Sequence, residues 1–555
     1  MAADPLRLRT QFERMLSTRR TYEPTWQLLG DYVLPRKNDI TTTQTPGVKR
    51  TDKLFDSSGP HDAELLRSSL AGALMPPMLK WFSLVMRDDA LNALKPVRDY
   101  LTFVRDRTLK ALSQSNFASE ILEVLHDLSV FGTGAMLQEA GPPGYLGKFG
   151  GFRFRALNAR EYVIGEDPFG RVDDLRRLYE MTASQILKRW FDNSTEATGI
   201  PEDVKQAMQQ DKPDQVFQVL HSCYPRMNRA PARHSNRNMP WASCYQMYGP
   251  KNELLEEGGF EEMPFLVPRW SKASGETYGY GPAHTALPDI RSLNRAIELY
   301  LAAAGKAVDP TILVDDDSLV STLTLEPAGA VVRRPDTKIE VLESKARFDV
   351  AEHLNERLER KIAEVFFLDA LRLRFKPNMT ATEVMALQDE MLRLLGPTAG
   401  RLHSELIGPI IERSIGILNR AGELPPPPDV LLQEGGDIDI QYEGPLARAS
   451  KSADLNAIDR VQAYRERIAQ STGRPDIYDV YDLDGEAAHY AVNGGYPAPF
   501  VRDADGIAQL RQARVQAQEQ QAQMAQMEQV AGAAGKAAPM LKVMQDATQP
   551  PEAAA

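Results

Sequence analysis

The sequence predicts an α+β protein in which helical segments flank short β-rich modules. Apolar residues recur at helical spacing through most of residues 5–130. From about residue 135 to 250 the pattern changes to short β-prone runs separated by turn residues. Two further helical segments, 289–304 and 348–367, bracket a second group of β-prone runs. Helices and β modules that occupy separate stretches of the chain indicate the α+β class.

The first 130 residues are expected to be mainly helical. Helical periodicity covers residues 5–36, 58–74 and, in two segments, 97–130. Pro24 and Pro35 are interpreted as breaks in the first segment, and Met75-Pro-Pro77 as the stop of the second. A short apolar strand or anchor is expected at 81–84.

The β-rich part begins with a predicted hairpin. Residues 137–139 and 152–155 flank a Gly-Pro-Pro-Gly turn region, and β-prone sequence continues at 161–164. Thr182 is the expected N-cap of a short helix that ends at Trp190. Strand-like sequence returns from 216 to 248, interrupted by a basic, Asn-rich loop at 226–238.

Two helices then enclose a small β module. The first, 289–304, matches the i, i+3, i+4, i+7 template, and β-prone runs follow at 311–314, 329–332 and 338–341. The second helix, 348–367, has an apolar stripe made of Ala351, Leu354, Leu358, Ile362 and Val365. Its opposite face carries Glu352, Glu356, Glu359, Arg360 and Glu364. The pattern predicts an antiparallel stalk with a β tip.

A basic segment follows this stalk. Arg372, Arg374 and Lys376 alternate with apolar residues, so an extended backbone would place three cations on one face. Thr380 and Glu383 have the spacing of a capping box that opens a helix. One interpretation is a strand of a sheet with its basic face in water. The other is a basic loop held between two helices, able to contact a polyanion.

The C-terminal part is expected to be helical with one strand. Helical sequence covers 381–395, 401–421 and 446–470, and a strand is expected at 438–442. Gly396-Pro397 breaks the first of these helices, and Gly422 fits the C′ position of the second. The Gln- and Ala-rich tail from Gln509 is either a long helix or a disordered extension.

Composition excludes several classes of protein. The net charge of −11 argues against a surface made for nucleic-acid binding throughout, but it allows a local basic patch. Cys223 and Cys244 are too few for a disulfide framework or a CxxC metal site, which fits a reducing compartment. There is no run of 18 apolar residues and no signal-peptide pattern, so we expect a soluble protein without a membrane partner.

We find no catalytic or cofactor motif. Gly305-Lys306-Ala307 lacks the hydroxyl residue of a phosphate-binding loop. Asp482, Asp484 and Glu486 lack the register of a calcium loop and are interpreted as a solvated acidic turn. His403-Ser-Glu405 lacks the second histidine of a zinc protease and is interpreted as surface, and Asp315-Asp-Asp317 as a charged turn. The sequence therefore predicts no enzyme and no cofactor.

The order of several short motifs resembles the head-to-tail connector, or portal, proteins of short-tailed, T7-like double-stranded DNA phages. The resemblance spans about residues 10–470. The motifs are Tyr22-Glu-Pro-Thr-Trp26, Lys53-Leu-Phe-Asp-Ser57, Leu74-Met-Pro-Pro-Met-Leu-Lys-Trp-Phe-Ser-Leu84, Phe131-Gly-Thr-Gly134, Tyr278-Gly-Tyr-Gly-Pro282, Ile290-Arg-Ser-Leu-Asn294, Thr380-Ala-Thr-Glu-Val384, Arg401-Leu402 and Gly444-Pro-Leu-Ala-Arg448. Each motif is weak alone, and their order and spacing carry the resemblance.

The resemblance implies a portal fold assembled as a ring, of twelve subunits in the family picture. It implies a mostly helical wing, stem and crown with small β-rich modules. The implied regions are a wing (1–283, β-rich at about 135–250), a first stem helix (284–307), a clip (308–346), a second stem helix (347–367), a tunnel loop (368–380), a tunnel helix and wing return (381–445), a crown (446–508) and a C-terminal helical barrel or flexible tail (509–555).

The resemblance also implies a function. A ring at one capsid vertex would pass double-stranded DNA non-specifically during packaging and ejection. Its expected partners are a terminase motor, tail adaptor proteins, and capsid and scaffolding proteins, with assembly in the host cytoplasm and a final place in the virion. Arg372, Arg374 and Lys376 would contact DNA, and Glu352, Glu356 and Glu359 would line the channel. The alternative is another virion assembly or scaffold protein without a DNA channel.

Overall fold

The structure is a computed structural model of the 555-residue chain. The residues that it describes are 4–43, 45, 47–76, 80–142, 144, 149–194, 197–227, 229, 235–308, 312–314, 339–341, 348–368, 396, 398–434, 437–442, 445–473, 478, 480–493, 502 and 506–524.

The chain divides into two compact units. The first unit comprises Met1–Ser83, Val104–Pro425 and Ile440–Ala449. The second comprises Leu84–Phe103, Pro426–Asp439 and Ser450–Ala555. The β-rich part and the predicted stalk both belong to the first unit.

Most helices of the first unit lie where helical periodicity predicts them. They are α1 (Pro5–Arg19), α2 (Glu23–Tyr32), η1 (Pro35–Lys37), α3 (Ser58–Leu74), α6 (Phe117–Phe131), α7 (Ala183–Trp190), α8 (Glu202–Gln209), η3 (Asn236–Asn238), α9 (Pro282–Val308), α10 (Phe348–Val365), the π-helix η5 (His403–Ile407) and α13 (Gly408–Arg420). The predicted break at Pro24 is confirmed, because α1 and α2 are separate helices. Pro24 lies in the first turn of α2, where a missing N–H costs nothing, and the chain breaks before it, after Arg19.

Three sheets of the first unit position these helices. A five-stranded antiparallel sheet has the order β4-β5-β6-β7-β8, a three-stranded sheet the order β3-β2-β9, and β10 pairs with β11. Their strands are β2 (Met136–Ala140), β3 (Phe152–Ala156), β4 (Tyr162–Glu166), β5 (Val172–Thr182), β6 (Val216–Pro225), β7 (Trp241–Met247), β8 (Leu254–Phe260), β9 (Phe265–Leu266), β10 (Ile312–Val314) and β11 (Ile339–Val341). The predicted hairpin is confirmed, because β2 and β3 pair in register from Met136↔Ala156 to Ala140↔Phe152.

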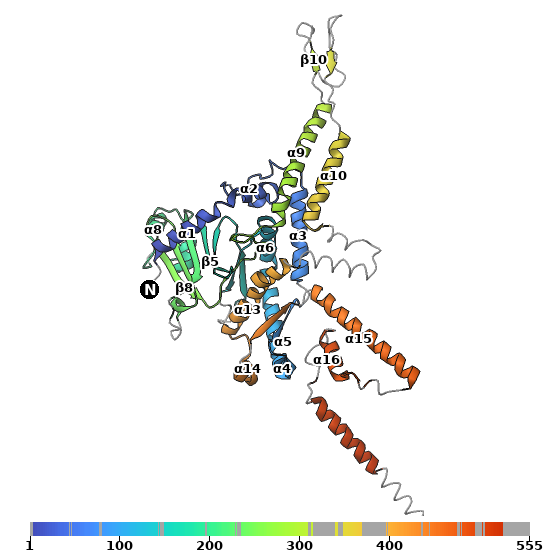
Figure 1. Cartoon of the computed structure of the whole chain (residues 1–555). Helices are drawn as coiled ribbons and strands as arrows, with labels where there is room; N and C mark the ends of the chain where they lie inside the picture. The colour runs from blue at the N-terminus through green and yellow to red at the C-terminus, as the bar shows by residue number, and fades with distance from the viewer. Residues whose placement is uncertain are drawn as a thin grey trace, which may run out of the picture. The chain divides into compact units, whose positions relative to one another are not determined.

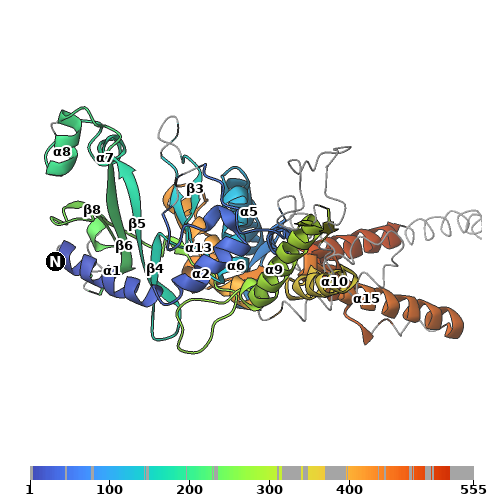
Figure 2. The same cartoon turned by 90° about the horizontal axis from the view of Figure 1, so that it is seen from above.

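Helices cover both faces of the five-stranded sheet. Val219 packs with α7 and α8, while the next residue, Leu220, packs with Phe12 of α1 on the opposite face. Figure 2 shows α1 and the α7–α8 pair beside this sheet. The Thr182 cap is confirmed as a full capping box with Gln185. The two buried cysteines are free, and burial raises the pKa of both thiols, which leaves them unreactive.

The second unit contains the helices expected near the C-terminus. Its elements include α4 (Asp89–Ala93), α14 (Asp429–Glu434) and α16 (Leu483–Asn493), together with a helix at 506–524. Helices α5 (Lys95–Ser113) and α15 (Pro445–Thr472) and the strands β1 (Phe82–Met86) and β12 (Ile438–Tyr442) each have residues in both units.

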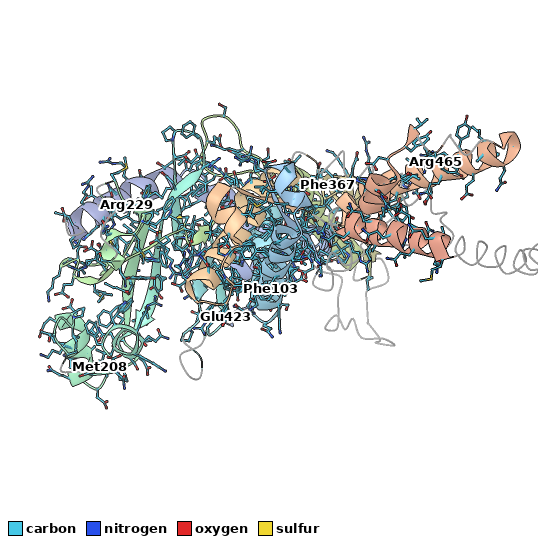
Figure 3. The ribbon with its side chains drawn as sticks, turned by 90° about the horizontal axis from the view of Figure 1, so that it is seen from below. Phe103, Met208, Arg229, Phe367, Glu423 and Arg465 are labelled. Atoms are coloured by element: carbon cyan, nitrogen blue, oxygen red, sulfur yellow. The ribbon has the colours of Figure 1, made fainter. Side chains whose placement is uncertain are left out.

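Asp482 and Asp484 are exposed, as the interpretation of a solvated acidic turn expected, but the segment is the start of a helix and not a turn. Asp484 and Glu486 lie in the first turn of α16, where carboxylates suit the helix dipole. Glu486 accepts two hydrogen bonds, of 2.7 and 2.8 Å, from the buried Arg465. Figure 3 labels Arg465 on α15. Asp484 pairs with Arg511 at 2.7 Å. Glu486 is therefore the partner of a buried arginine, whereas Asp484 forms an exposed ion pair.

Among the described helices, none has a stretch long and apolar enough to cross a membrane.

Candidate functional site

The predicted stalk is present as two helices that run side by side. Helices α9 and α10, here called the stem pair, extend together beyond the rest of the first unit, with β10 and β11 at their far end (Figure 1). Lys361 of α10 joins Asp289 of α9, with both carboxylate oxygens 2.9 Å from the ammonium nitrogen. The antiparallel strands pair from Ile312↔Val341 to Val314↔Ile339. The runs at 315–317 and 329–332 lie outside the described residues.

The first half of α9 is anchored and the second half is exposed. Up to Asn294 its inward side chains are buried: Pro282, Ala283, Ala286, Leu287, Ile290, Leu293 and Asn294. Farther along, Leu299 and Leu301 are each 53% exposed and Val308 is 87% exposed. The apolar pattern therefore continues past the point where the chain itself can bury it.

Helix α10 presents an acidic face. Glu352, Glu356 and Glu359 are exposed, and their i, i+4, i+7 spacing puts them on one side of the helix. Of the predicted apolar stripe, Ile362 near the end of the helix is buried. Leu354, nearer the start of the helix, is 50% exposed.

The basic segment lies outside the described residues. This applies to Arg372, Arg374 and Lys376 and to the capping box from Thr380. The residues on either side are described. Phe367, labelled in Figure 3, follows α10 with a left-handed φ of 59°, between the buried Phe366 and Leu368. The chain is next described continuously from residue 398 into the π-helix η5.

Two consecutive residues, Arg269 and Trp270, contact both of these flanks. The Trp270 ring lies 6.2 Å from that of Phe367. The buried Arg269 donates from Nη2 to Glu405 of η5 at 2.7 Å and from its backbone N–H to the same carboxylate at 2.9 Å. Arg269 also pairs with Glu166. The interpretation of Glu405 as surface is wrong, because this carboxylate balances a buried guanidinium.

Three glycines bring two motifs into direct backbone contact. A Cβ on Gly132, whose φ is 76°, would lie 2.4 Å from the Gly279 carbonyl oxygen. A Cβ on Gly279 would lie 2.4 Å from the Gly132 oxygen, and one on Gly281 2.6 Å from the Ser129 oxygen. No side chain fits between these segments, so glycine is required there.

Other motifs meet the same junction. The ring of Trp26 lies edge-on to that of Tyr278, with 5.1 Å between the ring centroids. The centroids of the Trp26 and Phe131 rings are 6.3 Å apart. The Asn294 side chain accepts from the backbone N–H groups of Phe55 (2.7 Å) and Asp56 (3.2 Å) and donates to the Lys53 carbonyl at 2.9 Å. Motifs separated by up to about 250 residues thus converge around the first half of α9. We call this junction the stem base.

A family model described as "Bacteriophage head to tail connecting protein" matches residues 6–501. The chain belongs to this family. The predicted resemblance to phage portal proteins is confirmed, and a structural connector is consistent with the absence of a catalytic motif in the sequence.

Several relatives of the connector chain are described as portal proteins. The "Probable portal protein" of Bordetella phage BPP-1 is 26% identical over 528 residues, covering 92% of this chain and 91% of the relative. The "Portal protein" of Salmonella phage epsilon15 is 25% identical over 530 residues, with the same coverage. The "Portal protein" of Escherichia phage T7 is 22% identical over 492 residues, covering 84% of this chain and 83% of the relative. A solved structure, "Virion of native gene transfer agent (GTA) particle", is similar with a TM-score of 0.35 at 10% identity, covering 76% of this chain and 91% of that chain.

The structure of the connector tests some site predictions and leaves others open. It places Glu352, Glu356 and Glu359 together on an exposed face. Arg269, Glu405 and the role of Asn294 were missed, because a lone arginine or asparagine has no sequence signal that reports a partner more than 100 residues away. Within the described residues there is no group of three or more His, Cys, Asp or Glu that could hold a metal ion.

Proposed function

We propose that twelve copies of this connector form a ring at one capsid vertex, with a central channel for DNA packaging and ejection. The observation that carries the proposal is the stem pair. It combines an exposed acidic face on α10 with exposed apolar side chains on both helices. One face suits a channel, and the others suit neighbouring copies.

The acidic face supports a channel for DNA because DNA must slide through it. Phosphate contacts to cations dominate protein–DNA affinity, and a lining of such contacts would hold the duplex in place. Glu352, Glu356 and Glu359 repeated around a ring would instead repel the phosphates. The apolar residues Leu299, Leu301 and Leu354 would then be covered by the adjacent copies.

The basic segment is the one part of the proposed channel that would attract DNA phosphates. Arg372, Arg374 and Lys376 would make transient, sequence-independent phosphate contacts in a tunnel loop. The segment at 308–346 would act as the clip that meets a terminase motor and later tail adaptor proteins. Residues 446–508 would form a crown and 509–555 a helical barrel or tail. Capsid and scaffolding proteins would contact the ring during assembly in the host cytoplasm.

Electron microscopy of the purified full chain tests the ring. Averaged end-on views should show twelvefold particles with a central hole. Monomers or dimers at concentrations that exceed those in an infected cell would contradict the proposal.

Charge neutralisation tests the acidic lining. The triple variant Glu352→Gln, Glu356→Gln, Glu359→Gln should still form rings but should bind duplex DNA more tightly and package it more slowly. A matched control with the same charge change is Glu180→Gln, Glu202→Gln, Asp214→Asn, at exposed positions of the β-rich part. If both triple variants package at the wild-type rate, α10 does not line the channel.

The basic segment needs its own variant. Replacing Arg372, Arg374 and Lys376 together by Gln should change DNA packaging or retention while ring assembly stays intact. The control replaces the exposed cations Arg7, Arg14 and Lys188 by Gln. Unchanged packaging in the first variant would remove these three residues from the DNA path.

A further inference from the structure

A small cavity lies beside the stem base. Its volume is about 200 Å³, and it is lined by Thr21, Tyr22, Thr25, Trp26, Glu276, Tyr280 and His284. The lining comes from the turn between α1 and α2, from the start of α2, and from the loop that leads into α9 together with its first turn. The glycines in contact at the stem base and the acidic face of α10 are not part of its lining.

The cavity contains one carboxylate and no cation. Glu276 is the acidic residue of the lining, and neither lysine nor arginine lines the cavity. Tyr22 donates its hydroxyl to Glu276 Oε2 at 3.4 Å. A hydrogen bond to Glu276 raises the pKa of Tyr280 to about 12, as expected beside an ionised carboxylate.

The remaining lining cannot neutralise that charge. Burial lowers the pKa of His284 to about 4, so the imidazole is neutral at pH 7. Its Nδ1 accepts from the Gly281 N–H at 3.2 Å. The cavity therefore holds one carboxylate and no side chain that is cationic at neutral pH.

Aromatic rings form the walls of the cavity. Tyr22 and Trp26 lie 6.1 Å apart, and Tyr280 lies edge-on to His284 at 5.1 Å. Aromatic faces attract organic cations, and a carboxylate adds a charged hydrogen-bond acceptor for ammonium or guanidinium N–H groups. The same walls disfavour a small, strongly hydrated metal ion, which would need several oxygen ligands.

We propose that this cavity binds an organic cation, with Glu276 as the charged partner of an ammonium or guanidinium group and Tyr22, Trp26 and Tyr280 as its aromatic walls. Two sources share this chemistry. One is a free diamine. The other is a lysine or arginine side chain of a second copy of the chain, and this source depends on the ring assembly proposed above.

Calorimetric titration of the purified full chain with 1,4-diaminobutane tests the site. Glu276→Gln keeps the shape of the side chain and should weaken binding at least tenfold. Glu261→Gln, an exposed acid of the same connection between β8 and α9, is the matched control and should bind like the wild type. Tyr280→Leu, which removes an aromatic wall, should weaken binding about two- to fivefold.

Assembly distinguishes the two sources. If a free diamine is the ligand, Glu276→Gln loses diamine binding but forms rings like the wild type. If a second copy supplies the cation, Glu276→Gln lowers the fraction of rings, and added diamine lowers it in the wild type but not in the variant. The inference is overturned if diamine binds wild type and Glu276→Gln equally and both assemble equally. If the cation site fails this test but rings still form, the proposed channel is not contradicted.

Discussion

The second half of α9 is richer in apolar residues than the first half, but only the first half buries them. Residues 282–294 pack at the stem base, where Gly132 and Gly279 touch backbone to backbone and Asn294 binds the loop at 53–56. Residues 295–308 leave Leu299 and Leu301 more than half exposed. One continuous helix is thus a core element at one end and leaves apolar side chains exposed at the other. Amphipathic periodicity alone does not distinguish these two roles.

The largest expected effect is at the stem base. Gly132→Ala should cost more than about 4 kcal/mol, because the new Cβ would lie 2.4 Å from the Gly279 oxygen in addition to the cost of a left-handed φ. Gly275→Ala is the control, since Gly275 has a similar φ of 82° and nothing within 4 Å. It should lose only about 1–2 kcal/mol in denaturant unfolding. Equal losses would show that backbone strain, and not the close contact, accounts for the glycine.

Acidification should also weaken the first half of α9. His284 has a pKa of about 4 in the folded chain, against 6.5 when unfolded. Between these values the unfolded chain binds a proton that the folded chain does not, so stability is complete above pH 6.5 and is lost as pH falls towards 4. The loss is about 2–3 kcal/mol.

Denaturant midpoints between pH 7 and pH 4 check this histidine. His284→Gln should show a smaller loss over that range, although His126, whose pKa burial lowers to about 3, still contributes. His353 of α10 is exposed, and His353→Gln is the control in the outer part of the stem. If the two variants give the same pH dependence, His284 is not the responsible group.

Asn294 marks the end of the anchored half. Asn294→Ala removes both hydrogen bonds to the N–H groups of Phe55 and Asp56 and should cost about 2–3 kcal/mol. Arg295→Ala, one residue farther, loses only an exposed pair with Glu298 and should cost about 0.5 kcal/mol or less. Similar losses of unfolding free energy in the two variants would show that the anchored half does not end at Asn294.

The smallest effect on stability is expected in the second half. Leu299→Ser with Leu301→Ser should change the unfolding free energy of the separate chain by less than about 0.5 kcal/mol, because both side chains are exposed. The ring fraction measured by sedimentation should fall. Leu6→Ser, at an exposed leucine of α1, is the control and should change neither quantity. A large loss of stability in the double variant would contradict a free surface on α9.

Sequence periodicity predicted most of the helices that the structure describes. Helix α3 begins and ends at the predicted residues, Ser58 and Leu74, because Pro60 and Met75-Pro-Pro77 mark its ends. Strand β8 was not predicted. Its Leu254-Leu-Glu-Glu-Gly-Gly-Phe260 sequence has low strand propensity, and pairing with β7 determines it.

The sequence also predicted some features of the candidate site and not others. The acidic face of α10 could be predicted because its three glutamates lie within one helix and follow its period. The balance of Arg269 by Glu405 could not, because it depends on tertiary proximity between residues 136 positions apart. The contact of Gly132 with Gly279 also needs the fold, although both motifs were recognised separately.

The length of α9 has a mechanical consequence. At 1.5 Å per residue its 27 residues span about 40 Å, and roughly the outer 20 Å lie beyond the anchored half. A sideways load at β10 and β11 would therefore act as a torque about the stem base. There the backbones of Gly132 and Gly279 meet without a side chain between them to yield. Such a torque would act on the packed backbone at the stem base, where no side chain between the two glycines could relax by changing its rotamer.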